Sequence, residues 1–362
     1  MKKKILVLIV LIFLLFLGKY LWQQYDLQLR IAPLYDQLSI ELSESDLLDN
    51  DLPQSYSTND ALWKTEVLDT LKVITQKVKS VVNQDDEWGR KQDWNSYWLD
   101  KNHPEPDLLW AIELVKWGDV LIQSLESDIN PFDNMRGQSD HLRVFRVKSE
   151  LIPYRVYLPK GYNSDKRYPV VIGFHSRDGT EDLFFHAFNG NDLRKVLDQK
   201  QFIFVGTTQG GLLGRCGEPH SKLVVHSLVE KISSRNDIDV NNISYLGHSR
   251  GSPAAIHCAI DKADTPRSII LMAPSFNVEK EFGEISVLRN IPIYIVTGGK
   301  DPSYRDNGKA MYDLLLANKF RNIAYKEVQG EDHFFTREAD HGELFTSIFM
   351  FLKEHEANCE SC

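Results

Sequence analysis

Three residue types that together can transfer an acyl group follow three separate strand-like stretches. The run Ile243–Leu246 leads into Gly247-His248-Ser249-Arg250-Gly251, a G-x-S-x-G sequence, and a helix-like stretch follows it. This strand–turn–helix context is the one in which a nucleophilic serine is exposed on a tight turn. Glycine suits both flanking positions because a Cβ there would collide with neighbouring backbone. Ser249 is therefore the candidate nucleophile.

An acid and a base follow Ser249 in the order, Ser, acid, His, that is typical of this strand–turn–helix architecture. The run Pro292–Val296 is followed by Asp301, and the run Ile323–Val328 is followed by His333. The carboxyl ends of parallel strands meet at one edge of a sheet, so the three side chains are expected to lie together. A serine hydroxyl needs a base to take its proton, and the base needs a group that orients it. We predict His333 as the base and Asp301 as its acid.

Each of these two residues has a rival nearby. His341 is an alternative base, and Asp306 is an alternative acid. Asp301 is preferred because it lies closer to the end of its strand. Two further histidines, His175 and His248, flank the expected site and are predicted to shape it, not to bind a metal.

Short apolar strands alternate with helices between residues 138 and 356, as in a parallel sheet that is covered on both faces. The expected strands are His141–Val147, Tyr154–Leu158, Pro169–Phe174, Phe202–Val205, Ile243–Leu246, Ser268–Met272, Pro292–Val296 and Ile323–Val328. The expected helices are Asn191–Lys200, Leu223–Ser234, Ser252–Ile260, Gly308–Asn318 and Glu343–His355. The fold class is therefore predicted to be α/β, with a mostly parallel sheet.

Four segments carry a resemblance to a known family. They are Tyr154-Arg155-Val156-Tyr157-Leu158-Pro159-Lys160-Gly161-Tyr162, Tyr168-Pro169-Val170-Val171, Gly247-His248-Ser249-Arg250-Gly251 and Gly330-Glu331-Asp332-His333. These segments resemble α/β-hydrolases, nearest to the esterase and depolymerase-like branch related to prolyl oligopeptidase catalytic domains. The resemblance covers about residues 140 to 356. It implies an acyl-enzyme mechanism in which backbone amides stabilise the oxyanion.

The expected oxyanion loop departs from the pattern of that family. Such proteins usually have His-Gly-x after the strand, whereas this chain has Phe174-His175-Ser176-Arg177-Asp178-Gly179. By position, the amides of Arg177 and Arg250 are expected to donate to the oxyanion. Ser176 replaces a glycine, which puts the loop geometry in doubt if that glycine needs an unusual backbone angle.

The substrate is predicted to be a carboxylic ester, either a small molecule or one linked to a polymer. An ester is favoured over a peptide because the region before the hydrolase domain gives no sign of the propeller that filters peptides in the prolyl oligopeptidase group. Arg177, Arg250 and His220 suggest an anionic acyl or leaving group, since guanidinium groups bind carboxylates in bidentate fashion. The alternative is that these are ordinary charged residues at the rim of the site, or that they form a salt bridge to Glu218, without a role in binding the substrate. Two other functions stay open, an inactive binding or scaffold module and an acyltransferase that uses the same triad.

Several classes of partner are not supported by the sequence. The net charge is -9, and no cluster of Lys and Arg occurs outside the N-terminal tip, so nucleic acid is not expected as a partner. No H-E-x-x-H, P-loop or dinucleotide fingerprint occurs, so neither a metal nor a cofactor is expected. Cys359 and Cys362 form a terminal C-x-x-C, and Cys216 and Cys258 could pair in an oxidising compartment.

The N-terminus predicts a signal anchor. Lys2, Lys3 and Lys4 precede an apolar run from Ile5 to Leu17. A helix from Ile5 to Trp22 would be about 27 Å long, enough to cross the hydrocarbon layer. The lysines place the tip in the cytoplasm and the remainder on the periplasmic or extracellular side, with a cleaved signal as the alternative.

Four regions are therefore expected along the chain. Residues 1–22 form the anchor, 23–137 a small helical region, 138–356 the hydrolase domain and 357–362 a tail. Within the helical region, one helix is expected to be capped by Asp60 and a second to begin near Pro106.

Overall fold

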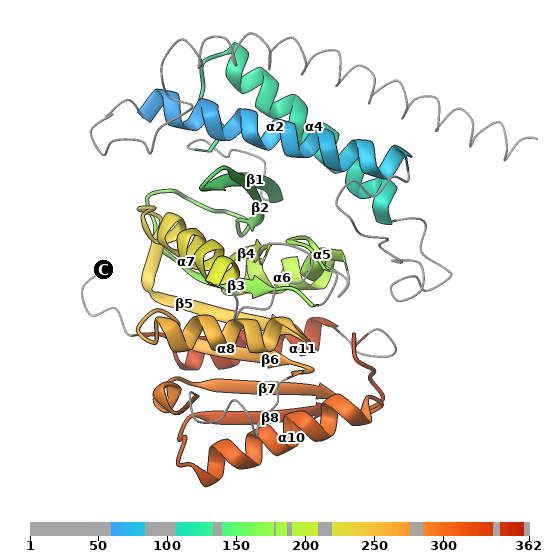
Figure 1. Cartoon of the computed structure of the whole chain (residues 1–362), viewed down its shortest axis with the longest axis vertical. Coiled ribbons are helices and arrows are strands. Elements are labelled where there is room, and N and C mark those ends of the chain that lie inside the picture. Colours follow the sequence, from blue (N-terminus) through green and yellow to red (C-terminus); the bar gives the residue numbers. More distant parts are fainter. Residues whose placement is uncertain are drawn as a thin grey trace, which may run out of the picture. The chain divides into compact units, whose positions relative to one another are not determined.

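The computed structural model describes residues 59–83, 106–132, 140–176, 179–186, 190–208, 219–275, 285–335 and 341–357 (Figure 1). The chain divides into two compact units. One contains the described helices between residues 59 and 126, and the other contains the described residues from 140 onward.

The first unit contains two helices that contact each other, α2 (Asn59–Asn83) and α4 (Pro106–Glu126). The prediction that α4 begins near Pro106 is confirmed, and a proline suits the first turn because its missing N–H has no helical partner there. The predicted cap at Asp60 is wrong, because α2 already begins at Asn59. Among the described residues, no helix combines the length and apolarity that crossing a bilayer requires. The predicted anchor, residues 1–22, lies outside the described residues.

The second unit is built on an eight-stranded sheet, in the order β1-β2-β4-β3-β5-β6-β7-β8. Strands β1 and β2 are joined as an antiparallel hairpin, β2 pairs with β4 antiparallel, and the remaining neighbours are parallel. The predicted mostly parallel α/β sheet is therefore confirmed. The strands are β1 (Asp140–Val147), β2 (Glu150–Tyr157), β3 (Tyr168–Phe174), β4 (Ile203–Thr207), β5 (Ile238–His248), β6 (Ser268–Met272), β7 (Ile293–Gly298) and β8 (Ile323–Val328).

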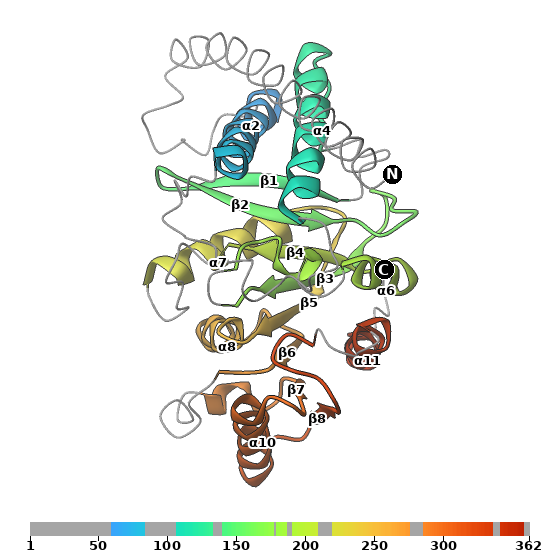
Figure 2. The same cartoon turned by 90° about the vertical axis from the view of Figure 1, so that its right-hand side faces the viewer.

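Helices cover both faces of this sheet, as Figure 2 shows with α7 and α8 on one side and α6 and α11 on the other. The helices of this unit are α5 (Leu183–His186), α6 (Gly190–Lys200), α7 (Pro219–Ser233), α8 (Gly251–Asp261), α10 (Pro302–Ala317) and α11 (His341–Glu354), with a short 3-10 turn at Ser286–Leu288. The sequence did not predict α5, which has only four residues. It also placed the start of β5 too late, because the early residues of that strand are polar and partly exposed.

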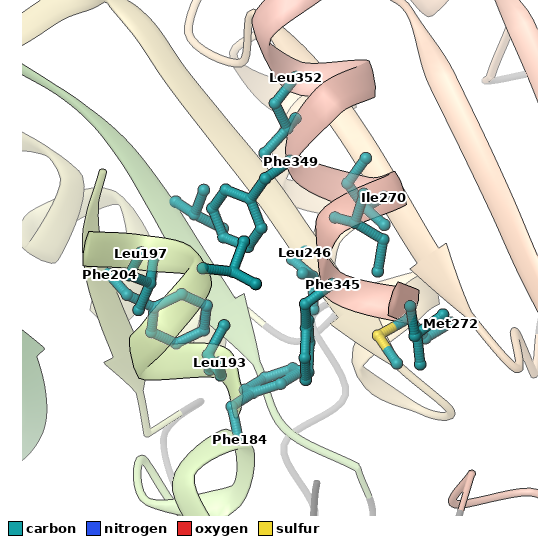
Figure 3. Close-up of a cluster of buried hydrophobic side chains, with 14 of the residues drawn as sticks. Phe184, Leu193, Leu197, Phe204, Leu246, Ile270, Met272, Phe345, Phe349 and Leu352 are labelled. Atoms are coloured by element: carbon teal, nitrogen blue, oxygen red, sulfur yellow. The ribbon is translucent and has the colours of Figure 1, made fainter. Parts of the chain in front are cut away.

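A large apolar core lies between the sheet and the α6–α11 layer (Figure 3). Phe204, Leu246 and Ile270 on the strands face Phe345 and Phe349 of α11. All five of these side chains are completely buried. Because Leu246 precedes Gly247 and the serine turn by so few residues, this core fixes the strand from which that turn departs.

Candidate active site

The turn that carries Ser249 joins β5 to α8 in a strained conformation. Ser249 has φ 53, in the left-handed region that costs a non-glycine residue about 1–3 kcal/mol. Three backbone hydrogen bonds hold it there, and the longest runs from the amide of Ser275 to the carbonyl of Ser249 at 3.3 Å. The amide of Ser249 donates to the carbonyl of Met272 at 2.8 Å, and the amide of Ser252 donates to the carbonyl of Ser249 at 3.0 Å. The serine is therefore fixed by strand β6 on one side and by its own helix on the other.

The two glycines of the motif are required by space. A Cβ at position 247 would lie 2.4 Å from the carbonyl oxygen of Gly251, and a Cβ at position 251 would lie 2.0 Å from the carbonyl oxygen of Phe174. A Cβ and a carbonyl oxygen that are not bonded to each other do not approach this closely. Gly251 therefore allows the serine turn to press directly against the end of β3, where the expected oxyanion loop begins.

Ser249, His333 and Asp301 form one hydrogen-bonded chain. The Ser249 Oγ lies 2.9 Å from His333 Nε2, and His333 Nδ1 lies 2.7 Å from Asp301 Oδ2. Because a carboxylate only accepts, Nδ1 carries the proton and Nε2 is left to accept the serine proton. Burial lowers the pKa of His333 below its usual value, and Asp301 opposes that shift. His333 is therefore neutral near neutral pH, with Nε2 in the state that the predicted role of base requires.

The loop that carries Asp301, at the end of β7, packs closely against the loop that carries His333, at the end of β8. A Cβ on Gly298 would lie 2.2 Å from the carbonyl oxygen of Asp332, so the two loops approach closely only because a glycine stands there. The amide of Lys300 donates to the carbonyl of Glu331 at 2.7 Å. This contact sets the spacing between Asp301 and His333.

The rival residues are engaged elsewhere. Nε2 of His341 hydrogen-bonds the carbonyl of Phe335. Asp306 pairs with Arg305 at 2.9 Å, and its side chain is 70% exposed. The structure thus brings His333 and Asp301 to Ser249 and brings neither rival.

Aromatic rings surround the base, and two of them were missed by the sequence reasoning. The ring centroid of His333 lies 4.0 Å from that of Tyr304 and 4.7 Å from that of Phe334. The ring of His248 lies 5.1 Å away. Phe334 is adjacent to His333 and Tyr304 follows Asp301 by three residues, so proximity along the chain was the available signal. These three rings all pack against the imidazole of His333.

The oxyanion side is described in part. Ser176 is buried, and its carbonyl accepts hydrogen bonds from Nδ1 of His175 at 2.7 Å and from the amide of Gly179 at 3.2 Å. Ser176 is not among the described non-glycine residues with positive φ, so a serine fits the backbone at that position. Arg250 has φ -65 and ψ -19 at the start of α8, which places its amide at the positive end of that helix. Arg177 lies outside the described residues.

A buried ionic network holds the segment that follows this loop. The Arg155 guanidinium binds Asp182 and Asp140 at 2.5 Å each, and Arg194 binds Asp140 at 2.9 Å. Burial raises the pKa of Asp140, but Arg155 and Arg194 outweigh it and lower the pKa to about 2. Next to Asp182, the carboxylate of Glu181 accepts a hydrogen bond from Thr208 Oγ1 at 2.7 Å. Glu181 and Asp182 are therefore connected through these side chains to β1, β2 and α6, and to Thr208 directly after β4.

Of the remaining residues that the sequence indicated, some are partly exposed or buried away from Ser249 and others lie outside the described residues. Nε2 of His220 lies 2.8 Å from a carboxylate oxygen of Glu150, and the His220 side chain is 43% exposed. Within the described ranges, no group of His, Cys, Asp and Glu side chains is placed to hold a metal. Cys258 is buried in α8. Cys216, Glu218, Cys359 and Cys362 lie outside the described residues.

No protein-family model matches the chain. Its fold is similar to that of a solved structure of a protein called FAE, with a TM-score of 0.51 and 15% sequence identity over 62% of this chain and 93% of that one. Others are the dienelactone hydrolase of Anabaena variabilis, with a TM-score of 0.48 and 12% identity over 60% of this chain and 98% of that one, and Est1E of Butyrivibrio proteoclasticus, with 0.47 and 14% over 59% and 98%. Together with the strand order and the serine turn, the likeness to FAE identifies the second unit as an α/β-hydrolase fold.

Proposed function

We propose that this protein is a serine hydrolase that acts through an acyl-enzyme intermediate, with Ser249 as nucleophile, His333 as base and Asp301 as the acid that orients the base. The observation that carries the proposal is the continuous hydrogen-bonded chain from Ser249 Oγ through His333 to Asp301, at 2.9 and 2.7 Å. The residues come from three different loops of one sheet edge, so local sequence does not force them together.

The proposed reaction follows from the direction of these hydrogen bonds. His333 Nε2 takes the proton of Ser249 as the serine oxygen attacks the ester carbonyl, and Asp301 stabilises the resulting imidazolium. The same proton then passes to the leaving alcohol, and water repeats the sequence to release the acid. The amides of Arg250 and Arg177 are proposed to bind the oxyanion.

A carboxylic ester, either a small molecule or one linked to a polymer, is the proposed substrate. The described residues before β1 form two helices and no strands, unlike a propeller that would select peptides. Arg250, Arg177 and His220 are proposed to favour an anionic acyl or leaving group. The Arg250→Glu variant is expected to lose more activity on an anionic ester than on a neutral ester of the same length. Equal losses on the two esters would remove this part of the proposal.

The test of the hydrolase itself is labelling of the full-length protein with a fluorophosphonate, which reacts with an activated serine. The wild type is expected to label, and Ser249→Ala is expected not to label. Ser252→Ala is the matched control, because Ser252 lies three residues away and its hydroxyl donates to the carbonyl of Gly247. A folded wild type that does not label would contradict the proposal and favour a binding or scaffold module.

Labelling alone does not say which acceptor takes the acyl group. Ester turnover is therefore followed with and without an added alcohol or amine. Release of the free acid in both cases is expected of a hydrolase. Transfer to the acceptor with no free acid would instead identify an acyltransferase that uses the same triad.

The location of the catalytic domain is a separate proposal. Residues 1–22 are proposed to anchor the protein, with the hydrolase domain on the periplasmic or extracellular side. The domain is expected to remain with membranes after washing with carbonate and to be digested by protease added outside. A soluble protein shortened at its N-terminus would point to a cleaved signal.

A further inference from the structure

His248 occupies an unusual position between the nucleophile and the base. It is the last residue of β5, it directly precedes Ser249, and its side chain is completely buried. Its Nε2 lies 2.9 Å from the carbonyl oxygen of His333. Because a carbonyl only accepts hydrogen bonds, the Nε2 of His248 must carry a proton and donate it.

This bond joins two parts of the chain that must keep a fixed separation. One end is attached to the residue before Ser249, and the other end is the backbone of His333 itself. The other described backbone contacts of this loop to the rest of the chain lie on either side of His333, at Glu331 and Asp332 before it and at the Phe335 carbonyl after it. The bond from His248 therefore reaches the main chain at the residue whose imidazole must meet Ser249 and Asp301.

The ring of His248 also packs on the base loop. It lies 5.1 Å from the ring of His333 and 5.3 Å from that of Phe334, measured between centroids. Burial and the neighbouring His333 together lower the pKa of His248 to about 3, against the opposing effects of the His333 carbonyl and of Asp332. His248 is thus a neutral donor at physiological pH and does not compete with His333 for the serine proton.

We propose that His248 is a positioning residue, whose Nε2–H holds the His333 carbonyl so that the imidazole of His333 stays within hydrogen-bonding reach of both Ser249 and Asp301. This inference rests on the proposed hydrolase function. Its physical basis is the steep dependence of such reactions on geometry, where a displacement of about 1 Å costs about 10²-fold in rate.

Two substitutions separate the hydrogen bond from the packing. His248→Phe keeps a ring of similar size and removes the donor, whereas His248→Gln keeps an N–H near the position of Nε2. His355→Phe is the matched control. Nδ1 of His355 bonds the carbonyl of Phe351 at 2.8 Å at the end of α11, so this variant removes a histidine-to-carbonyl bond outside the triad.

The experiment measures fluorophosphonate labelling of the full-length variants over a range of probe concentrations, together with their melting temperatures. His248→Phe is expected to lower the labelling rate at saturating probe by about 10²-fold and to leave the half-saturating concentration within about twofold of the wild type. His248→Gln is expected to recover about tenfold of that loss. His355→Phe is expected to label at the wild-type rate.

Two results would overturn the inference while the hydrolase proposal stands. One is a wild type and a His248→Phe variant that label equally fast. The other is equal slowing in the Phe and Gln variants with equally lowered melting temperatures, which would assign His248 to packing. A folded wild type that does not label at all would overturn the proposed function, and this inference with it.

Discussion

The two sides of Ser249 are held in different ways. On the base side, His333 is fixed by hydrogen bonds to Ser249 and Asp301 and by packed rings. On the oxyanion side, the chain after Ser176 is tied down by the buried ion pairs of Arg155 with Asp182 and Asp140. The base side controls the direction of one side chain, whereas the oxyanion side anchors a stretch of main chain.

This difference predicts whether a substitution on each side lowers the stability or the reaction rate. A buried ion pair adds little net stability while it is intact, but loss of one partner leaves an uncompensated charge. Damage to the oxyanion-side network should therefore appear mainly as lost stability. The side chains of His333 and Asp301 are partly exposed, 19% and 13%, so water can replace a lost partner and damage to the base side should appear mainly as lost rate.

The largest expected effect on rate is that of Asp301→Asn. An amide in place of the carboxylate favours the wrong tautomer of His333, so kcat is expected to fall by about 10⁴-fold. The melting temperature should change little. Steady-state ester hydrolysis and thermal unfolding measure the two quantities. Asp306→Asn is the control and is expected to keep nearly full activity, so a similar loss in both variants would argue against the assignment of Asp301.

The largest expected effect on stability is that of Asp182→Ala. The variant leaves the Arg155 side chain, which is 6% exposed, without one of its two carboxylates. The free energy of unfolding is expected to fall by about 3–5 kcal/mol, as measured by urea denaturation. Lys309→Met breaks an exposed pair with Asp313 and should cost at most about 1 kcal/mol. Equal small losses in the two variants would show that the buried network does not stabilise the oxyanion side.

Gly251→Ala tests the place where the two sides meet. The new methyl group would lie 2.0 Å from the carbonyl oxygen of Phe174, so either the serine turn or the end of β3 must move. We expect a loss of about 1–3 kcal/mol in stability together with a large loss of labelling. Gly161→Ala is the control, because Gly161 has φ +79 and nothing within 4 Å of the added methyl group. It should cost stability through strain alone and leave labelling intact.

The same contrast explains what could be predicted from the sequence. Ser249, Asp301 and His333 each follow an apolar strand, and a parallel sheet brings such strand ends to one edge, so the pattern itself predicted their meeting. The network of Arg155, Asp140 and Asp182 gave no such signal. Its members are separated by 15 and 27 residues, and each side chain taken alone looks like an ordinary polar position. Buried charges of this kind become visible only when the partners are placed.

The orientation of the base loop was also beyond the sequence. The bond from His248 to the His333 carbonyl depends on main-chain position, and no side-chain pattern encodes it. The doubt about Ser176 had a similar origin. Whether a serine can replace the glycine depends on φ at that residue, and the sequence does not give that angle, which is not positive at Ser176.

The smallest expected effect concerns the pH dependence of the base. Burial lowers the pKa of His333 below 6.5, against the opposing effects of Asp301 and Asp332. The acidic limb of the kcat/KM profile should therefore lie below pH 6.5. The unfolded chain binds this proton first as the pH falls, so the contribution of His333 to stability is present above pH 6.5 and is lost as the pH falls through the folded pKa.

Tyr304→Ala tests whether the ring that covers His333 causes this shift. Removal of the ring admits water to the imidazole, so its pKa should rise towards the usual value and the acidic limb should move to higher pH. At pH values above the acidic limb, kcat/KM of Tyr304→Ala should fall much less than that of Asp301→Asn. Tyr312→Ala is the control. Tyr312 lies in the same helix as Tyr304, α10, but packs on Tyr325 of β8, with ring centroids 5.7 Å apart. A shift of the acidic limb to lower pH in Tyr304→Ala would contradict this explanation. It would show that the ring stabilises the contact between His333 and Asp301 more than it excludes water, so that the aromatic packing, like the hydrogen bonds, orients the imidazole.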